Sequence, residues 1–287
     1  MSILTALNAY LHLDTRQRTF MREKEIDTSM TLEEWIPFLG GVARADRASD
    51  VLRKMLGWLT ILTIVPGFVL AIVTESATPL LLWIASSVSV FCWLRLRKID
   101  MPPSLDRFLL PWLVLLKEDV APKSEVSLRL DLRGAELTQK AIMAADMPNG
   151  VPRSPRACND NYFRDDWASG TASLADGAIL QWDISDFVRK RVKTRRNARG
   201  KTKRKTKYKI QRSFDVNLSV RDRDYAVSNI VPDTACRASV KRGEKRTAVR
   251  IRTRSVGRER FTPPRLTDLV DTISRAYSSL SVAPKER

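Results

Sequence analysis

The sequence predicts a membrane protein in which a two-helix transmembrane hairpin precedes a cytoplasmic α+β domain dominated by antiparallel strands and closed by a C-terminal helix. Two uncharged runs within residues 55–96 and a strict alternation of apolar and polar residues over 178–220 are the main observations. We expect four parts: an N-terminal cytoplasmic helical segment (1–54), the transmembrane hairpin (55–96), an interfacial helix and linker (97–123), and a basic β-rich domain (124–287).

The two uncharged runs have the lengths of membrane spans. Residues 55–74 contain no charge, and a helix of this length rises about 30 Å, the thickness of a bilayer core. The second span, 79–96, is uncharged as far as Leu94 and reaches 96 if Arg95 extends its side chain to the interface. The alternative is a buried αα-hairpin in a soluble core, which would have to hide two successive uncharged runs from water.

Charged and aromatic residues flank these spans in an asymmetric way. Basic residues precede the first span and follow the second, whereas the turn between them carries only Glu75. The positive-inside rule therefore predicts a multi-pass protein of the inner (cytoplasmic) membrane with both termini in the cytoplasm, surrounded by membrane lipid. Indole rings and long basic side chains favour the lipid–water interface, which is the expected location of Trp58, Trp83, Trp93, Trp112, Arg53, Lys54, Arg95, Arg97 and Lys98.

Each span also contains two small residues four positions apart. Gly67 and Ala71 form the pair in the first span, and Ala85 and Ser89 form the pair in the second. Such pairs let two helix backbones approach closely, so they predict contact within the hairpin or with a partner protein.

The residues before the first span suggest short helices joined by a linker. Apolar spacing predicts a helix at 1–13, and the polar composition of 16–29 predicts a linker. Thr31 and Glu34 have the spacing of a capping box, so a second helix should start there. We expect the glycine pair at 40–41 to end it.

The segment after the second span starts with a break at Pro102 and Pro103 and continues as an apolar helix. Residues 104–117 are helical in composition and too short to cross a bilayer. The helix is either interfacial, held by Trp112, or a core helix of the following domain. Its position directly after the membrane exit favours the interfacial alternative.

The soluble domain is expected to start near residue 124. Alternation at 125–132 predicts a strand, 135–145 resembles a short helix, and 147–167 reads as a loop rich in proline and asparagine. Period-two alternation then predicts a long antiparallel hairpin over 178–220, with its turn near Asn197 and Gly200.

A second hairpin and a helix complete the predicted domain. The strands of the hairpin are expected at about 235–240 and 246–256, with a turn at Gly243. An amphipathic helix is predicted at 265–280.

The net charge of +18 is concentrated in the long hairpin. Residues 189–212 contain fourteen basic and no acidic side chains. These groups repel one another, and a polyanion would relieve that repulsion. The candidate polyanion-binding residues are Arg189, Lys190, Arg191, Lys193, Arg195, Arg196, Arg199, Lys201, Lys203, Arg204, Lys205, Lys207 and Lys209.

Three partners would neutralise such a segment: nucleic acid, anionic lipid, or the acidic face of a protein partner or of further copies of the chain. Single-strand binders stack bases on aromatic rings, and only Phe187 and Tyr208 lie within the hairpin's basic half. Contact with a phosphate backbone or with lipid is therefore favoured over base reading. The alternative is a solvated basic hairpin that only protects an edge strand from aggregation.

The sequence shows no constellation of catalytic residues. His12 is the only histidine, and Cys92, Cys158 and Cys236 do not have metal-ligand spacing. Neither a Walker loop nor a GxGxxG motif is present. We therefore expect no enzymatic activity, no cofactor and no metal site.

Two aspartate pairs are the nearest approach to a metal motif. Asp222 and Asp224 form a D-x-D, and Asp165 and Asp166 are adjacent. Either pair could bind a divalent cation, but turn and strand-end positions explain them more simply.

These observations predict a non-enzymatic inner-membrane protein whose basic cytoplasmic β-domain binds a polyanion or a partner subunit at the membrane surface. The order of the parts also resembles that of two-span membrane effectors of bacterial anti-phage systems, in which a cytoplasmic sensor domain follows a membrane hairpin. That resemblance implies an alternative: a sensor domain that binds a small anionic ligand, oligomerises and disrupts the membrane.

Overall fold

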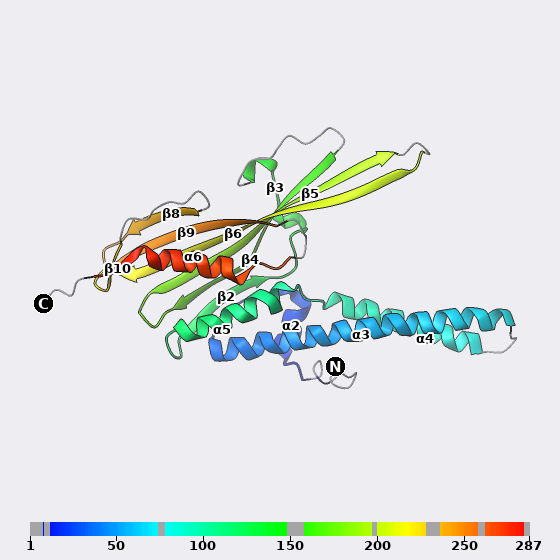
Figure 1. Ribbon diagram of the computed structural model, residues 1–287. Coiled ribbons are helices and arrows are strands. Elements are labelled where there is room, and N and C mark those ends of the chain that lie inside the picture. Colours follow the sequence, from blue (N-terminus) through cyan, green and yellow to red (C-terminus); the bar gives the residue numbers. More distant parts are fainter. Residues whose placement is uncertain are drawn as a thin grey trace. The chain divides into compact units, whose positions relative to one another are not determined.

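The computed structural model describes residues 8, 12–73, 78–147, 158–196, 200–227, 236–257 and 262–283 (Figure 1). The chain forms two compact units. A helical unit comprises 1–24 and 37–105, and a sheet unit comprises 25–36 and 106–287. The helix predicted at 1–13 lies almost entirely outside the described residues.

The helical unit starts with α2 (Thr15–Glu23), so the prediction of a polar linker at 16–29 is wrong. A capping box forms its first turn: the Asp14 carboxylate accepts from the Thr15 N–H at 2.6 Å, and Gln17 Oε1 accepts from the Asp14 N–H at 3.0 Å. Phe20 and Met21 are buried, and the Phe20 ring lies 5.9 Å from the ring of Phe38. Two buried residues thus anchor a helix whose remaining residues are polar.

The second helix, α3 (Leu32–Val73), starts as predicted but continues through the glycine pair. The Thr31 N–H donates to Glu34 Oε2 at 3.1 Å, as the capping box requires. A Cβ at Gly41 would collide with the side-chain amide of Gln17, which donates to the Phe38 carbonyl at 2.9 Å. Gly41 therefore allows close packing of α2, and the helix tolerates it at a cost of about 1 kcal/mol relative to alanine.

Helix α3 and helix α4 (Thr78–Lys98) contain the two predicted spans and are long and apolar enough to cross a membrane. Their most apolar windows are only 11% and 17% buried. Exposed side chains include Trp58 at 67% and Ile72 at 75%. The outer surface of this helix pair is therefore apolar.

Small and hydroxylated residues form the contact between these two helices. Thr60 and Ser89 share a hydrogen bond of 3.1 Å, and Ser89 Oγ also donates to the Leu56 carbonyl at 3.0 Å. A Cβ at Gly67 would lie 3.0 Å from the Trp83 ring. Ala71 and Ala85 are exposed, so one member of each predicted small-residue pair lies in the contact and the other does not.

A polar cluster in the helical unit fixes the chain where it leaves α4. Asp46 Oδ1 accepts from the Met101 N–H at 2.8 Å, and Lys24 Nζ donates to the Asp100 carbonyl at 2.6 Å. Arg53 pairs with Asp50 and, at 3.0 Å, with Asp100. Arg53, predicted at the lipid interface, is thus held by carboxylates of its own chain.

The Asp46 carboxyl should make stability depend on pH. Burial, together with the negative charges of Asp50 and Asp100, raises its pKa to about 6. The folded state therefore binds this proton more tightly than the unfolded state, and stability falls as the pH rises from about 4 to about 6. The variant Asp46→Asn keeps a carbonyl acceptor for the Met101 N–H. We expect its free energy of unfolding at pH 7 to be about 1–2 kcal/mol higher than that of the wild type.

Thermal unfolding in detergent between pH 4 and pH 7 measures this effect. The advantage of Asp46→Asn should grow with pH, whereas Asp46→Ala, which loses the acceptor, should be less stable than Asp46→Asn at every pH. A difference between wild type and Asp46→Asn that stays constant over this range would contradict the assignment.

The sheet unit is built on an antiparallel sheet with strand order β1-β2-β4-β5-β6-β9-β8, and β3 pairs with β4 outside this path (Figure 1). The strands are β1 (Glu25–Thr31), β2 (Glu125–Asp131), β3 (Ala141–Ile142), β4 (Cys158–Ser173), β5 (Ile179–Arg196), β6 (Thr202–Arg221), β8 (Cys236–Arg242) and β9 (Arg246–Gly257). The predicted strand at 125–132 and both predicted hairpins are confirmed.

Two strands lie where the sequence predicted none. β1 falls in the expected linker and pairs with β2 from Glu25↔Asp131 to Thr31↔Glu125, so the sheet unit does not begin at 124. β4 falls in the expected loop and pairs with β5 from Cys158↔Lys193 to Ser173↔Ile179. Its first half is rich in charged and amide side chains, so it lacks the alternation of apolar and polar residues that predicts a strand.

The remaining elements of the sheet unit are mostly short. A π-turn (Leu105–Leu109) leads into α5 (Leu110–Asp119), and α6 (Leu266–Ser278) is the predicted C-terminal helix. β10 (Leu280–Val282) pairs with β7 (Tyr225–Val227) in a small second sheet. The helix predicted at 135–145 is wrong, because this segment forms two 3-10 turns (Thr138–Lys140 and Ala144–Asp146) around β3.

Helices α5 and α6 cover one face of the sheet. Trp112 of α5 is 4% exposed and meets Trp182 of β5 edge to face at 5.6 Å. Thr272 of α6 shares a hydrogen bond of 2.7 Å with Thr253 of β9. α5 is therefore a core helix, and the prediction that Trp112 lies at the lipid interface is wrong: its indole is buried against the sheet.

Candidate functional site

The long β5–β6 hairpin forms where the sequence predicts it, within 178–221. Its strands pair continuously from Ile179↔Ser219 to Arg196↔Thr202. Even-numbered residues of its first half, such as Trp182 and Phe214, are buried under the helices. The alternation seen in the sequence therefore places the odd-numbered residues on the opposite face.

A row of buried charges crosses the core face of the sheet and interrupts this apolar surface. Arg212 donates two hydrogen bonds to Asp186, at 2.6 and 2.7 Å. Lys140 bridges Asp131 at 2.9 Å and Asp165 at 2.5 Å. Burial raises the pKa of Asp165 to about 6, and the Lys140 ammonium opposes this rise. Beyond the row, Phe163, Val188 and Ile210 form a small separate core.

Within this charge row, the Lys140 ammonium pairs with Asp165, one member of the aspartate pairs considered as cation ligands. Asp166 pairs with Arg164 at 2.9 Å, and Asp224 pairs with Arg223 at 3.3 Å. Within the described ranges, no group of three or more histidine, cysteine or acidic residues could hold a metal ion.

The hairpin's basic half begins with cations that are paired inside the sheet unit. Asp160 of β4, whose side chain is 5% exposed, accepts from Arg189 at 2.6 Å and from Arg191 at 2.8 Å. Glu136 pairs with Lys190 and also accepts from the Tyr208 hydroxyl at 2.9 Å. Three of the predicted polyanion-binding residues are thus engaged by acids that lie far from them in the sequence.

On the odd-numbered face of the hairpin, basic residues stand directly opposite one another. The register sets cation against cation in four successive cross-strand pairs, which we call the cation ladder: Arg189↔Lys209, Arg191↔Lys207, Lys193↔Lys205 and Arg195↔Lys203. Directly opposed side chains have Cβ atoms about 5 Å apart, and like charges there are destabilising by about 0.2–1 kcal/mol per pair. The two outer pairs therefore oppose the folding of the hairpin, whereas Asp160 neutralises the arginines of the two inner pairs.

The other face of the outer hairpin is also basic. It pairs Thr194 with Arg204 and Arg196 with Thr202. Toward the tip, Val192 is the last apolar residue on this face among the described residues of β5, and it is 7% exposed. Beyond this point the hairpin is a hydrophilic ribbon with cations on both faces.

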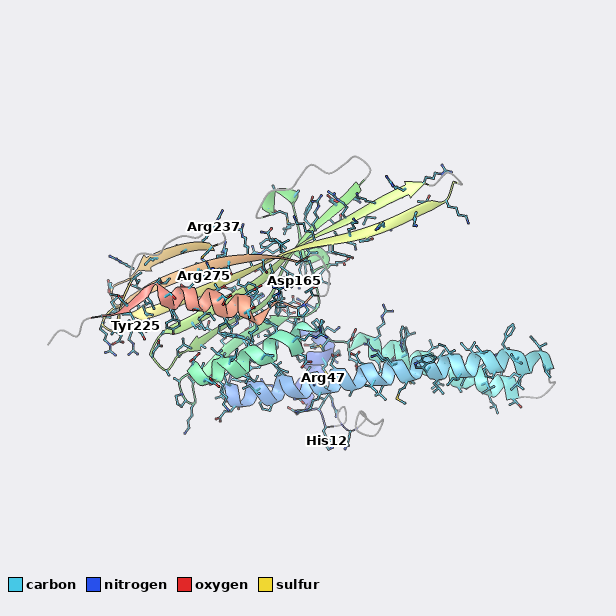
Figure 2. The ribbon with its side chains drawn as sticks, viewed as in Figure 1. His12, Arg47, Asp165, Tyr225, Arg237 and Arg275 are labelled. Carbon is cyan, nitrogen blue, oxygen red and sulfur yellow. The ribbon has the colours of Figure 1, made fainter. Side chains whose placement is uncertain are left out.

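The tip of the hairpin extends beyond the described residues of the neighbouring strands. Among these residues, β4 pairs with β5 as far as Lys193, and β9 pairs with β6 as far as Ile210. Figure 1 shows β5 and β6 continuing past the rest of the sheet, and Figure 2 shows side chains projecting from both sides of this part. We call these residues, 193–196 and 200–209, the distal ribbon. Gly200 has a φ of +74°, as predicted for the turn, whereas Arg199 lies outside the described residues.

The distal ribbon holds most of the predicted polyanion-binding residues. Lys193 is partly exposed, and the others are exposed: Arg195, Arg196, Lys201, Lys203, Arg204, Lys205, Lys207 and Lys209. Arg196 Nε donates to the Gly200 carbonyl at 3.1 Å, which closes the turn.

A cavity of about 560 Å³ lies between α5 and α6. No sequence pattern predicted it. Trp112, Leu180 and Ile273 contribute to its apolar lining, and Glu118 and Asp176 are among the acids that border it. The buried Trp112 Nε1 has no hydrogen-bond partner in the described part of the chain. The bordering charges are negative, so the cavity does not suit an anionic ligand.

Comparisons with protein-family models, curated proteins and solved structures found no significant match to this chain.

Proposed function

We propose that this chain is a non-enzymatic two-span protein of the inner (cytoplasmic) membrane, with both termini in the cytoplasm, and that its sheet unit holds a polyanion or an acidic partner at the membrane surface through the distal ribbon. The cation ladder is the observation that carries this proposal. Its two outer pairs, Lys193↔Lys205 and Arg195↔Lys203, oppose folding, and a bound polyanion would convert the same charges into a stabilising contact.

The apolar helix pair supports the membrane part of the proposal. Large apolar side chains such as Phe68 and Leu81 are 64% and 65% exposed, far more than in the core helices of a soluble domain. Arg95 and Arg97 lie over the rings of Phe91 and Trp93, at 5.1 and 5.7 Å, where α4 ends. Basic and aromatic residues together are typical of a cytoplasmic interface.

Membrane placement is tested by fractionation and by protease access. We expect the full-length chain to sediment with membranes and to resist extraction by alkaline carbonate, because two spans bury apolar surface in lipid. A C-terminal tag should be cleaved in inverted vesicles and protected in intact spheroplasts. Recovery of the chain in the soluble fraction, or a tag that is accessible from outside, would overturn this placement.

The sheet unit's alternative role is that of a sensor in a membrane-disrupting effector. A small anionic ligand would have to bind the ribbon, since acids border the cavity between α5 and α6. Toxicity on expression that requires residues 55–96 would favour this alternative. Growth that is unaffected by the intact chain would favour the tethering function.

A further inference from the structure

We infer that the polyanion bound by the distal ribbon is duplex DNA, with the ribbon lying in the major groove between the two phosphate backbones. This inference rests on the proposed function and names its ligand. The shape of the ribbon, its two charged faces and the scarcity of apolar or stacking side chains among its described residues support this inference.

The ribbon is basic on both faces. The cation ladder occupies one face, and Arg196 and Arg204 occupy the other. A lipid surface is flat and neutralises only the face that lies on it. The walls of a DNA groove are phosphate backbones on both sides, so a groove neutralises both faces of an inserted ribbon at once.

The dimensions of the ribbon also fit the major groove of DNA. The major groove of B-DNA is about 12 Å wide and 8.5 Å deep and admits a two-stranded β-ribbon. The two strands lie about 4.8 Å apart, and the four paired residues from Lys193 to Arg196 span about 13 Å. The free part of the ribbon is therefore long enough to fill the depth of the groove. The major groove of an RNA duplex is too narrow to admit it.

The described part of the ribbon has few of the apolar and aromatic side chains with which proteins insert into lipid or stack on single-stranded bases. Proteins that insert into lipid headgroups use aromatic or large aliphatic residues, and the described part of the distal ribbon contains only Tyr208, whose hydroxyl is bound to Glu136. Single-strand binders need stacking rings, and the Phe187 ring is covered by the Arg164 guanidinium at 5.7 Å. Contact with the phosphate backbone of a duplex fits this composition better than headgroup insertion or base stacking does.

The test measures fluorescence anisotropy of labelled nucleic acids with the full-length protein in mild detergent. We expect a 20-base-pair DNA duplex to bind at least about tenfold more tightly than an RNA duplex or a DNA single strand of the same sequence. With about six phosphate contacts, the slope of log K against log salt concentration should be about −5. A DNA duplex with glucosylated hydroxymethylcytosine, which fills the major groove, should bind at least about tenfold more weakly than the unmodified duplex.

Flotation with vesicles containing about 30% phosphatidylserine distinguishes the possible failures. Binding to such vesicles or to the RNA duplex as tight as binding to the DNA duplex would overturn the DNA assignment and leave the polyanion function standing. Equal affinity for plain and glucosylated duplexes would overturn the groove placement. Binding to none of these polyanions would overturn the inference and leave an acidic protein partner as the only ligand that the proposed function allows.

Discussion

Replacing six cations of the distal ribbon with glutamine should lower polyanion affinity by at least about 10³-fold at 100 mM salt, because each lost phosphate contact removes a released counterion. The substituted residues are Arg195, Arg196, Lys203, Arg204, Lys205 and Lys207. The slope of log K against log salt should become shallower by about 5 over the same titration. Anisotropy with a fixed duplex over several salt concentrations gives both numbers.

The same variant should be more stable than the wild type. It breaks the like-charged pairs of Lys193 with Lys205 and Arg195 with Lys203, each of which is destabilising by about 0.2–1 kcal/mol. A gain in stability together with a loss of binding is the pattern expected when a charged surface is kept for a ligand. A solvated hairpin without a ligand would show only the gain in stability.

A control variant separates local from overall charge. It removes an equal number of exposed cations at the other end of the sheet, by glutamine substitution of Arg221, Arg223, Arg237, Lys241, Arg242 and Lys245. This variant has the same net charge as the ribbon variant but keeps the cation ladder. Affinity that falls equally in both variants would mean that net charge, and not the ribbon, determines binding.

Replacing Asp160 with asparagine should destabilise the sheet unit by about 2–4 kcal/mol and at the same time strengthen polyanion binding. The carboxylate is 5% exposed and neutralises Arg189 and Arg191, whose side chains are only 12% and 21% exposed. Removing the anion leaves two largely buried cations without their charge partner, which is far more costly than losing a surface pair. The two guanidinium groups would then become available to a bound polyanion.

Asp166 provides the matched control for this substitution. It lies on the same strand and pairs with Arg164 at 2.9 Å, but both side chains are more than half exposed. Asp166→Asn should therefore cost less than about 1 kcal/mol and leave affinity unchanged. Chemical denaturation and duplex titration of both variants give the comparison. Equal stability of the two variants, or weaker duplex binding by Asp160→Asn, would contradict the role assigned to Asp160.

Several elements of this fold follow from local sequence patterns. The predicted spans, 55–74 and 79–96, coincide with α3 as far as Val73 and with α4, because length and apolar composition are properties of a single segment. The β5–β6 hairpin follows from period-two alternation over its whole length. The cations are likewise visible from composition alone.

Other elements depended on contacts between distant segments. β1 is a polar stretch that becomes a strand because β2, about one hundred residues later, supplies its hydrogen bonds. β4 reads as a loop because its aspartates and asparagines are poor strand formers, and the cations of β5 stabilise it in place. The sequence predicted Trp112 at the lipid interface. In the structure its ring packs against Trp182 of the sheet and is buried.

The sequence by itself therefore determined the apolar helix pair, the extent of the long hairpin and the position of the positive charge, because periodicity and composition act over a few neighbouring residues. The tertiary structure alone decided which of those charges remain exposed. Asp160 and Glu136 neutralise cations of the inner part of the hairpin from 29 to 54 residues away, whereas the described strand pairing reaches Lys193 and Ile210, and most residues of the distal ribbon are exposed. Neutralisation of charge depends on proximity in space, which no local pattern encodes.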